Sequence, residues 1–136
     1  MWLNRIGNNL EIKRLYGDIS PRFHDAVLLG LKMDYVKNEY VVQIEYYDWP
    51  TPLPEGWIPD KQYCGIYLDF SMKNILFKYT DFNCLYDNDH CSIDIEVSDD
   101  GEFNMKAKTG VGQLIFELTT FCVTVSYFGY VDHRLD

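Results

Sequence analysis

Alternation of apolar and polar residues is the sequence feature that most restricts the fold of this chain. In the segment 91–97, Ile93, Ile95 and Val97 take every second position, and polar residues take the positions between them. Because successive side chains of a strand point to opposite faces of a sheet, this segment is expected to bury one face and expose the other to water. Burial on one face is typical of antiparallel sheets.

Similar runs, rich in β-branched and aromatic residues, predict about eight strands with a break near Ser71. The strands are expected at residues 26–33, 40–47, 63–70, 74–79, 91–97, 102–108, 113–118 and 121–128. A short helix, capped at Asn9 and stopped at Gly17, should precede them. The predicted fold class is mainly β (α+β), with antiparallel strands in consecutive hairpins forming a meandering curved sheet, a barrel or a sandwich. The length of 136 residues fits a single domain, 1–136.

Residues 48–62 interrupt the alternation. The segment contains four prolines and two tryptophans, Trp49 and Trp57. Proline at this density cannot lie inside a sheet, so we expect an ordered loop. The indoles either pack back onto the core or stand out as an interface anchor. Trp57, in the middle of the loop, is the candidate anchor, and Trp49, nearer the strand end, is the candidate core residue.

Acidic residues are concentrated in the middle of the chain. Residues 41–102 hold three Lys or Arg and thirteen Asp or Glu, a net charge of −10, and the whole chain carries −9. The last part of this region, without any Lys or Arg, contains Asp81, Asp87, Asp89, Asp94, Glu96, Asp99, Asp100 and Glu102. A field of one sign accelerates encounter with a basic partner and opposes binding of nucleic acid. The alternative is a solvated acidic face that keeps the protein soluble.

The four cysteines, Cys64, Cys84, Cys91 and Cys122, show no close pairing. No signal peptide is recognisable and no apolar stretch approaches the ~20 residues needed to span a bilayer, so we expect a cytoplasmic protein with reduced thiols, no cofactor and no membrane contact. Cys122 lies in an alternating run and is expected to be a small core residue. A zinc site of Cys64, Cys84, His90 and Cys91 is the alternative, but its spacing matches no common zinc motif, and no metal is predicted.

Phe23, His24 and Asp25 lie just before the first predicted strand. A histidine beside a carboxylate can act as a general base or a metal ligand. Consecutive residues of an extended strand point to opposite faces, however, so His24 and Asp25 are expected to hold the junction between helix and strand. The alternative function is a small β-barrel hydrolase or isomerase that uses His24 and Asp25 for acid–base chemistry.

The run from Leu15 to Ala26, with Phe23-His24-Asp25 as its distinctive part, resembles the start of the immunity protein 50 family of bacterial toxin–antidote systems. Residues 27–31, 66–70 and 91–95 resemble strands of the same pattern. The resemblance implies a non-enzymatic cytoplasmic inhibitor, which binds a cognate toxin domain and blocks its active site or substrate channel. The family offers no catalytic residues to transfer.

Charge and resemblance indicate the same class of function. We expect an immunity protein that neutralises a basic toxin protein through an acidic and aromatic surface, without enzymatic activity. The expected partner-binding residues are Asp81, Asp87, Asp89, Asp94, Glu96, Asp99, Asp100 and Trp57. Many antibacterial toxins cleave nucleic acid and are basic, so an acidic inhibitor can mimic phosphate. A plain oligomeric module is a third alternative, and the sequence leaves the toxin and the oligomeric state open.

Overall fold

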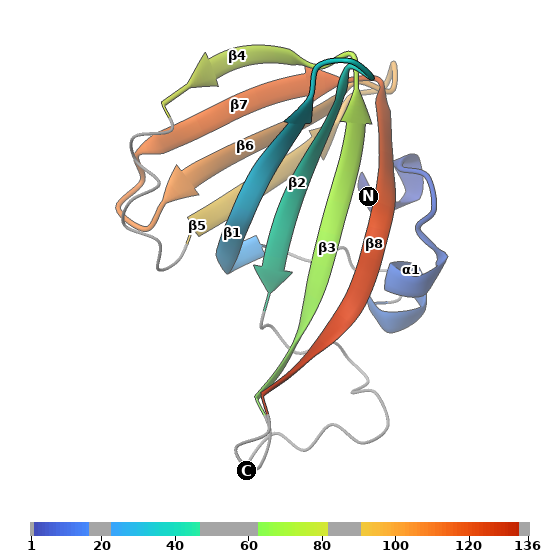
Figure 1. Cartoon of the computed structure of the whole chain (residues 1–136), viewed down its shortest axis with the longest axis vertical. Helices are drawn as coiled ribbons and strands as arrows, with labels where there is room; N and C mark the ends of the chain where they lie inside the picture. Colours follow the sequence, from blue (N-terminus) through green and yellow to red (C-terminus); the bar gives the residue numbers. More distant parts are fainter. Residues whose placement is uncertain (1, 17–22, 47–62, 82–90, 134–136) are drawn as a thin grey trace.

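Eight antiparallel strands form one strongly curled sheet in the computed structural model, which describes residues 2–16, 23–46, 63–81 and 91–133 (Figure 1). A 3₁₀ turn, η1 (Trp2–Arg5), and a helix, α1 (Leu10–Tyr16), precede the strands. The strands are β1 (Phe23–Asp34), β2 (Glu39–Tyr46), β3 (Tyr63–Lys73), β4 (Leu76–Thr80), β5 (Cys91–Val97), β6 (Phe103–Thr109), β7 (Leu114–Thr120) and β8 (Cys122–His133). The predicted class, mainly antiparallel β in a curved sheet with one short N-terminal helix, is confirmed, and the sheet keeps two edges, β4 and β8.

The strand order is β4-β7-β6-β5-β1-β2-β3-β8. Two meanders, β1–β2–β3 and β5–β6–β7, are joined side by side through β1 and β5. The prediction of consecutive hairpins is wrong for the connections β3–β4, β4–β5 and β7–β8, because β4 pairs with β7 and β8 returns to pair with β3. Alternation specifies which face of a strand is buried, but it leaves open which strands become neighbours.

The break between the third and fourth strands lies at Asn74 and not near Ser71. β3 continues to Lys73, and Asn74 then adopts a left-handed φ of 52°. Asparagine tolerates this conformation better than most residues do. The turn carries the chain from β3 to β4, in the other half of the sheet.

The core lies inside the curl, between the two halves of the sheet. Rings from strands that are not neighbours meet across it: the ring centroids of Phe70 and Phe103 are 6.4 Å apart, and those of Tyr40 and Phe77 are 6.0 Å apart. The largest fully buried residues of the sheet are Ile44, Ile66, Leu68, Phe70, Met72, Phe103, Met105, Ile115, Phe116 and Leu118. Strands β2, β3, β6 and β7 thus supply the largest buried side chains, whereas Phe77 of the edge strand β4 is only half-buried against this core.

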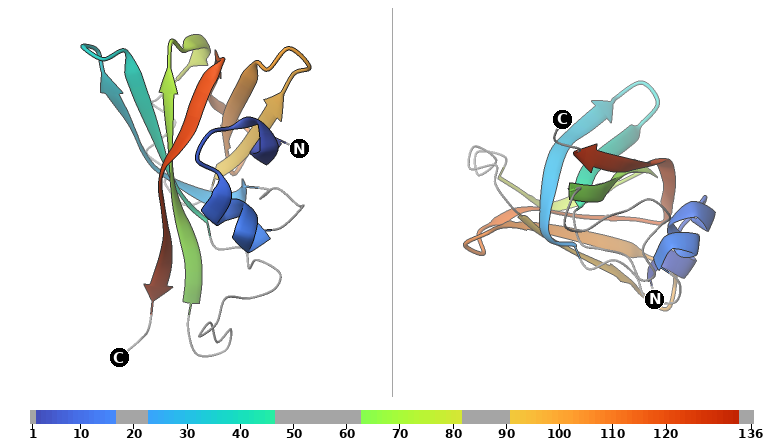
Figure 2. Two further views of the ribbon diagram at one scale, coloured as in Figure 1. Left: turned by 90° about the vertical axis from the view of Figure 1, so that its right-hand side faces the viewer. Right: turned by 90° about the horizontal axis from the view of Figure 1, so that it is seen from below.

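The N-terminal segment covers the edge of β8 and fills the open side of the curl (Figure 2). The backbone N–H of Gly7 donates to Val123 O at 3.1 Å, and the N–H of Val125 donates to Gly7 O at 3.0 Å. The ring of Trp2 lies 5.9 Å from the ring of Phe23, and Leu3 and Ile6 are buried in the same core. Trp2, Leu3 and Ile6 therefore act as part of the β core although they lie in no strand.

The predicted helix is confirmed as α1, although Gly17, its predicted stop, lies outside the described residues. The first turn of α1 is stabilised in an unexpected way. The backbone carbonyl of Asn9 accepts the first helical hydrogen bond, from Lys13 N at 2.9 Å. The Asn9 side chain, which could cap a helix amide, instead donates to Leu3 O at 2.7 Å. Asn9 thus ties the helix to η1, and Ile12 anchors the helix in the core.

The register of β8 places Cys122 on the exposed face. Val123 pairs with the buried Met72 of β3 and is itself buried, as is Val125. Because neighbouring residues of a strand point to opposite faces, Cys122 points outward and is exposed. The expectation that Cys122 is a core residue is therefore wrong.

Candidate protein-binding surface

Four turns lie at one end of the sheet, the upper end in Figure 1. They are residues 34–39, 73–76, 98–102 and 120–122, and we call them the turn rim. Glu39 of β2 pairs with Lys73 of β3, which also pairs with Cys122 of β8. In the other half of the sheet, Phe103 of β6 pairs with Thr120, the last residue of β7. The turn rim therefore draws on both halves of the sheet.

Hydrogen bonds connect neighbouring turns of the turn rim. The Asn38 side-chain amide donates to Asn74 Oδ1 at 2.8 Å. The Thr120 hydroxyl donates to Lys73 O at 2.5 Å and accepts from the backbone N–H of Cys122 at 3.0 Å. The backbone is thus held on both sides of residue 121.

The β5–β6 turn presents two of the predicted acidic residues, Asp99 and Asp100, in a fixed conformation. The Ser98 hydroxyl and, at 3.5 Å, the Glu102 backbone N–H both donate to Asp100 Oδ1. The hydrogen bond from Ser98, followed by that from Glu102, lowers the pKa of Asp100. Gly101 adopts a φ of 91°, which allows a tight turn between the two strands predicted at 91–97 and 102–108. Both carboxylates are exposed at the tip of the hairpin.

The sheet face behind this turn carries charges of both signs. Asp94 and Glu96 are exposed on β5, as expected. Asp94 lies directly across from Lys106 of β6, which lies across from Glu117 of β7, and Glu96 lies across from Asn104. The acidic stretch has no basic residue within it, but the fold places a lysine beside it. The field over this face is therefore weaker than the sequence suggests.

The remaining predicted partner-binding residues lie elsewhere. The backbone N–H of Asp81 donates to Ile115 O at 2.7 Å, at the end of β4 that is farther from the turn rim. Asp87, Asp89 and Trp57 lie outside the described residues. The structure thus brings together Asp99 and Asp100 at the tip and Asp94 and Glu96 behind them, while Asp81 is separate.

Large apolar side chains are exposed on the turn rim. Phe121 is 66% exposed and Leu76 is 64% exposed. Tyr35 and Val36, at the tip of the β1–β2 turn, are exposed as well. Sequence reasoning missed these residues, because Phe121 was expected inside a strand, and Tyr35 and Val36 fall in the connection between the strands predicted at 26–33 and 40–47. A signal was present, since an apolar pair in an otherwise polar turn has no core to enter.

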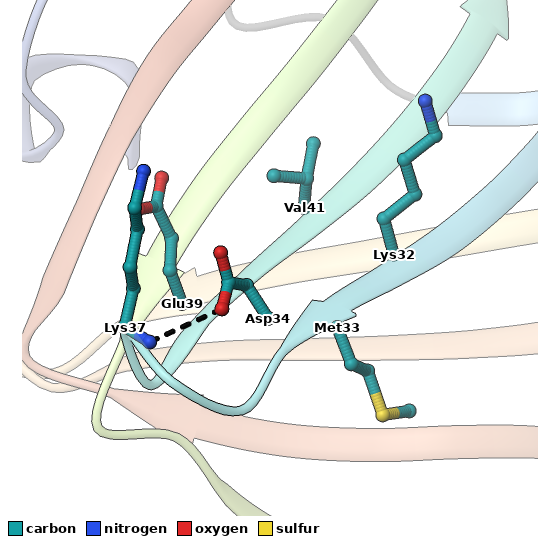
Figure 3. A pocket seen from close by; sticks show the side chains of 6 residues that line it. All are labelled: Lys32, Met33, Asp34, Lys37, Glu39 and Val41. Carbon is teal, nitrogen blue, oxygen red and sulfur yellow. Dashed lines mark hydrogen bonds between the residues drawn. The ribbon is translucent and has the colours of Figure 1, made fainter.

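A shallow pocket of about 210 Å³ lies beside the β1–β2 turn (Figure 3). It is lined by Lys32, Met33, Asp34, Lys37, Glu39 and Val41. Asp34 Oδ1 accepts hydrogen bonds from the backbone N–H groups of Val36 and Lys37, each at 3.1 Å, so this carboxylate stabilises the turn. Because the lining carries both signs of charge, it does not select a cation or an anion.

Phe23, of the Phe23-His24-Asp25 motif, is a core residue at the start of β1. Its ring lies 5.1 Å from the ring of Tyr46 in a T-shaped contact, and it is buried. The side chains of His24 and Asp25 lie outside the described part of the structure. Their expected role at the junction, and the alternative acid–base role, both stay predictions.

Cys91, one of the four residues of the alternative zinc site, is buried, and its thiol donates to Ala26 O at 3.3 Å. Burial raises the pKa of this thiol, which keeps it protonated and unreactive. The side chains of Cys64, Cys84 and His90 lie outside the described residues. Among the side chains that are described, no group of three His, Cys, Asp or Glu could hold a metal ion.

Two tyrosines lie close together on the outer face of β3 and β8. The pKa of Tyr67 is raised by desolvation and further by the charges of Glu45 and Tyr127. The Tyr127 hydroxyl lies 2.7 Å from the position that a Cβ atom would take on Gly129, so the glycine makes room for the phenol. Both phenol groups can donate hydrogen bonds.

In comparisons with known proteins, no protein family, no curated protein and no solved structure matches this chain. Within the described segments, no helix has the length and apolar character needed to cross a membrane. The resemblance to immunity proteins therefore stays a prediction, and a functional proposal has to come from the surface itself.

Proposed function

We propose that this protein is a non-enzymatic immunity protein, which binds a basic bacterial toxin domain and blocks its active site or substrate channel. The observation that carries the proposal is the β5–β6 turn. Its carboxylates, Asp99 and Asp100, are exposed at the tip of a hairpin in a chain of net charge −9.

Exposed carboxylates on an ordered turn suit the recognition of a basic protein for two reasons. Their field raises the association rate with a partner of opposite charge. The hydrogen bonds from Ser98 and Glu102 already order Asp100 in the free protein, so binding loses less conformational entropy there. A toxin that cleaves nucleic acid needs basic groups for phosphate, and carboxylates on a hairpin tip can take the positions of those phosphates.

The lysines of β6 favour the turn over the sheet face as the site of contact. Lys106 lies across from Asp94 and weakens the field there. The described residues of the turn, 98–102, include no basic side chain. We therefore assign the electrostatic part of the interaction to Asp99 and Asp100.

The test uses the toxin domain encoded beside the gene for this protein. The toxin should arrest bacterial growth when produced alone, and coproduction of this protein should restore growth. Asp99→Asn combined with Asp100→Asn should slow association about tenfold at low salt, and less at high salt, in stopped-flow measurements.

The matched control combines Glu11→Gln with Asp81→Asn, which removes the same charge away from the β5–β6 turn. This control should slow association much less than the turn variant does. The proposal is refuted if the wild-type protein neither binds the toxin nor restores growth.

A further inference from the structure

We infer that the turn rim is the face that docks onto the toxin, with Phe121 as its apolar anchor and the β5–β6 turn as its acidic flank. The inference rests on the proposed function and specifies its interface. The predicted acidic surface follows β5, whereas the turn rim crosses the ends of several strands.

Phe121 is held ready for binding by its neighbours. The Thr120 hydroxyl bridges Lys73 O and the backbone N–H of Cys122, at 2.5 and 3.0 Å, so the chain is fixed on both sides of the phenyl ring. The ring is nevertheless 66% exposed. A phenyl group on an ordered turn can enter a partner's pocket with little further loss of backbone freedom.

Leu76 extends the apolar part of the turn rim next to Phe121. It pairs with Thr119, two residues before Phe121, and its side chain is 64% exposed. Aromatic residues such as Phe are enriched at the centre of protein interfaces, and the contacts around such an anchor help to exclude water from it. Leu76 fits this second role.

The charges on the two sides of this apolar centre differ. On one side, the β5–β6 turn carries Asp99 and Asp100. On the other side, the β1–β2 turn carries Lys37 together with Asp34 and Glu39, so acid and base are mixed there (Figure 3). This asymmetry defines the partner: a protein with an apolar pocket for Phe121 and basic side chains on the side of that pocket facing Asp99 and Asp100.

The experiment measures binding of the adjacent-gene toxin to a turn-rim variant and to a matched control. The variant combines Phe121→Ser with Leu76→Ser. The control combines Val111→Ser with Leu10→Ser, because Val111 and Leu10 are also exposed but lie away from the turn rim. We expect Kd to rise at least about 30-fold for the variant, mainly through faster dissociation, and less than about threefold for the control. Urea unfolding midpoints of both variants serve to check that each one folds.

The outcomes separate the inference from the proposed function. Equal affinity of the wild-type protein and the turn-rim variant overturns the inference and leaves the proposed function intact. No binding by the wild-type protein overturns the proposed function, and the inference with it. If the wild-type protein dimerises in sedimentation experiments, and the variant is monomeric but binds toxin normally, the turn rim is a contact between copies and the inference is wrong.

Discussion

The two edges of the sheet end in different ways. At the β8 edge, Gly7 exchanges hydrogen bonds with Val123 and Val125, so the N-terminal segment covers the first part of the strand. At the β4 edge, no strand of the described residues pairs with the outer side. β4 is instead short, has an irregular register at Lys78, and exposes Leu76 and Tyr79.

Both arrangements reduce the same risk, because the unpaired backbone groups of an edge strand can form hydrogen bonds with another chain. The first part of the β8 edge is covered by the chain itself, and Leu3 and Ile6 become part of the core. The β4 edge is limited by its length, by the irregularity at Lys78 and by the charge of that lysine. The comparison predicts that changes at the β8 edge lower the free energy of unfolding, whereas changes at the β4 edge mainly alter self-association.

The largest effect should come from matched leucine truncations at the two edges. Leu3→Ala, in the segment that covers β8, removes a fully buried side chain and should lower the free energy of unfolding by about 2–5 kcal/mol. Leu76→Ala, on β4, should change it by less than about 0.5 kcal/mol, because this side chain is largely exposed. Urea unfolding measures both. A loss for Leu3→Ala of less than about 0.5 kcal/mol would mean that the N-terminal segment does not stabilise the sheet.

A smaller loss of unfolding free energy should follow when a methyl group is added at Gly7, where the backbone lies close to β8. A Cβ atom on Gly7 would lie 2.8 Å from Thr124 Cγ2, so Gly7→Ala should cost about 1–3 kcal/mol of unfolding free energy. Thr124→Ser removes that methyl group and should restore most of the loss in the double variant. Gly30→Ala is the control, since its nearest atom, Gln43 Oε1, is at 3.5 Å. The close-approach explanation fails if Thr124→Ser gives no rescue.

Much of this fold follows from local sequence, and the parts that do not are non-local. The bounds of β5 agree with the alternation at 91–97, and the turn at 98–101 has the glycine that its positive φ requires. The role of Leu3 and Ile6 was missed, because a short segment without periodicity gives no sign that it will enter the core. Lys106 beside Asp94 was missed because cross-strand neighbours depend on register.

The candidate surface was predictable only in part for the same reason. Asp99 and Asp100 are recognisable from the sequence because the turn that presents them is local. The convergence of Phe121 and Leu76 on the turn rim depends on the pairing of β4 with β7 and on the return of β8 to β3. No single run of residues encodes that arrangement.

Removing the charge from the β4 edge should change self-association more than stability. Lys78→Ile leaves a short apolar edge with Leu76 and Tyr79 exposed, so sedimentation velocity should show oligomers at concentrations where the wild-type protein is monomeric. Lys106→Ile makes the same charge change on β6, where Asp94 of β5 and Glu117 of β7 pair with this residue on its two sides, and should not associate. Association of both variants alike would show that loss of charge, and not the open edge, is responsible.

The smallest change in stability is expected at the β5–β6 turn. This turn belongs to neither edge and is held by its own hydrogen bonds, so it serves as a comparison for both. The pKa of Asp100 is lowered in the folded protein by Ser98 and Glu102, so the unfolded chain takes up this proton first as the pH falls. The stabilisation is therefore complete above the usual Asp pKa of about 3.9 and is lost as the pH falls through that value toward the lower folded-state pKa. Asp100→Asn should be slightly less stable than the wild-type protein near neutral pH, and the difference should vanish in acid. Urea midpoints measured across this range test the sign: a difference that grows in acid would mean that the charge of Asp100 opposes folding, and that the turn is ordered by its backbone bonds alone.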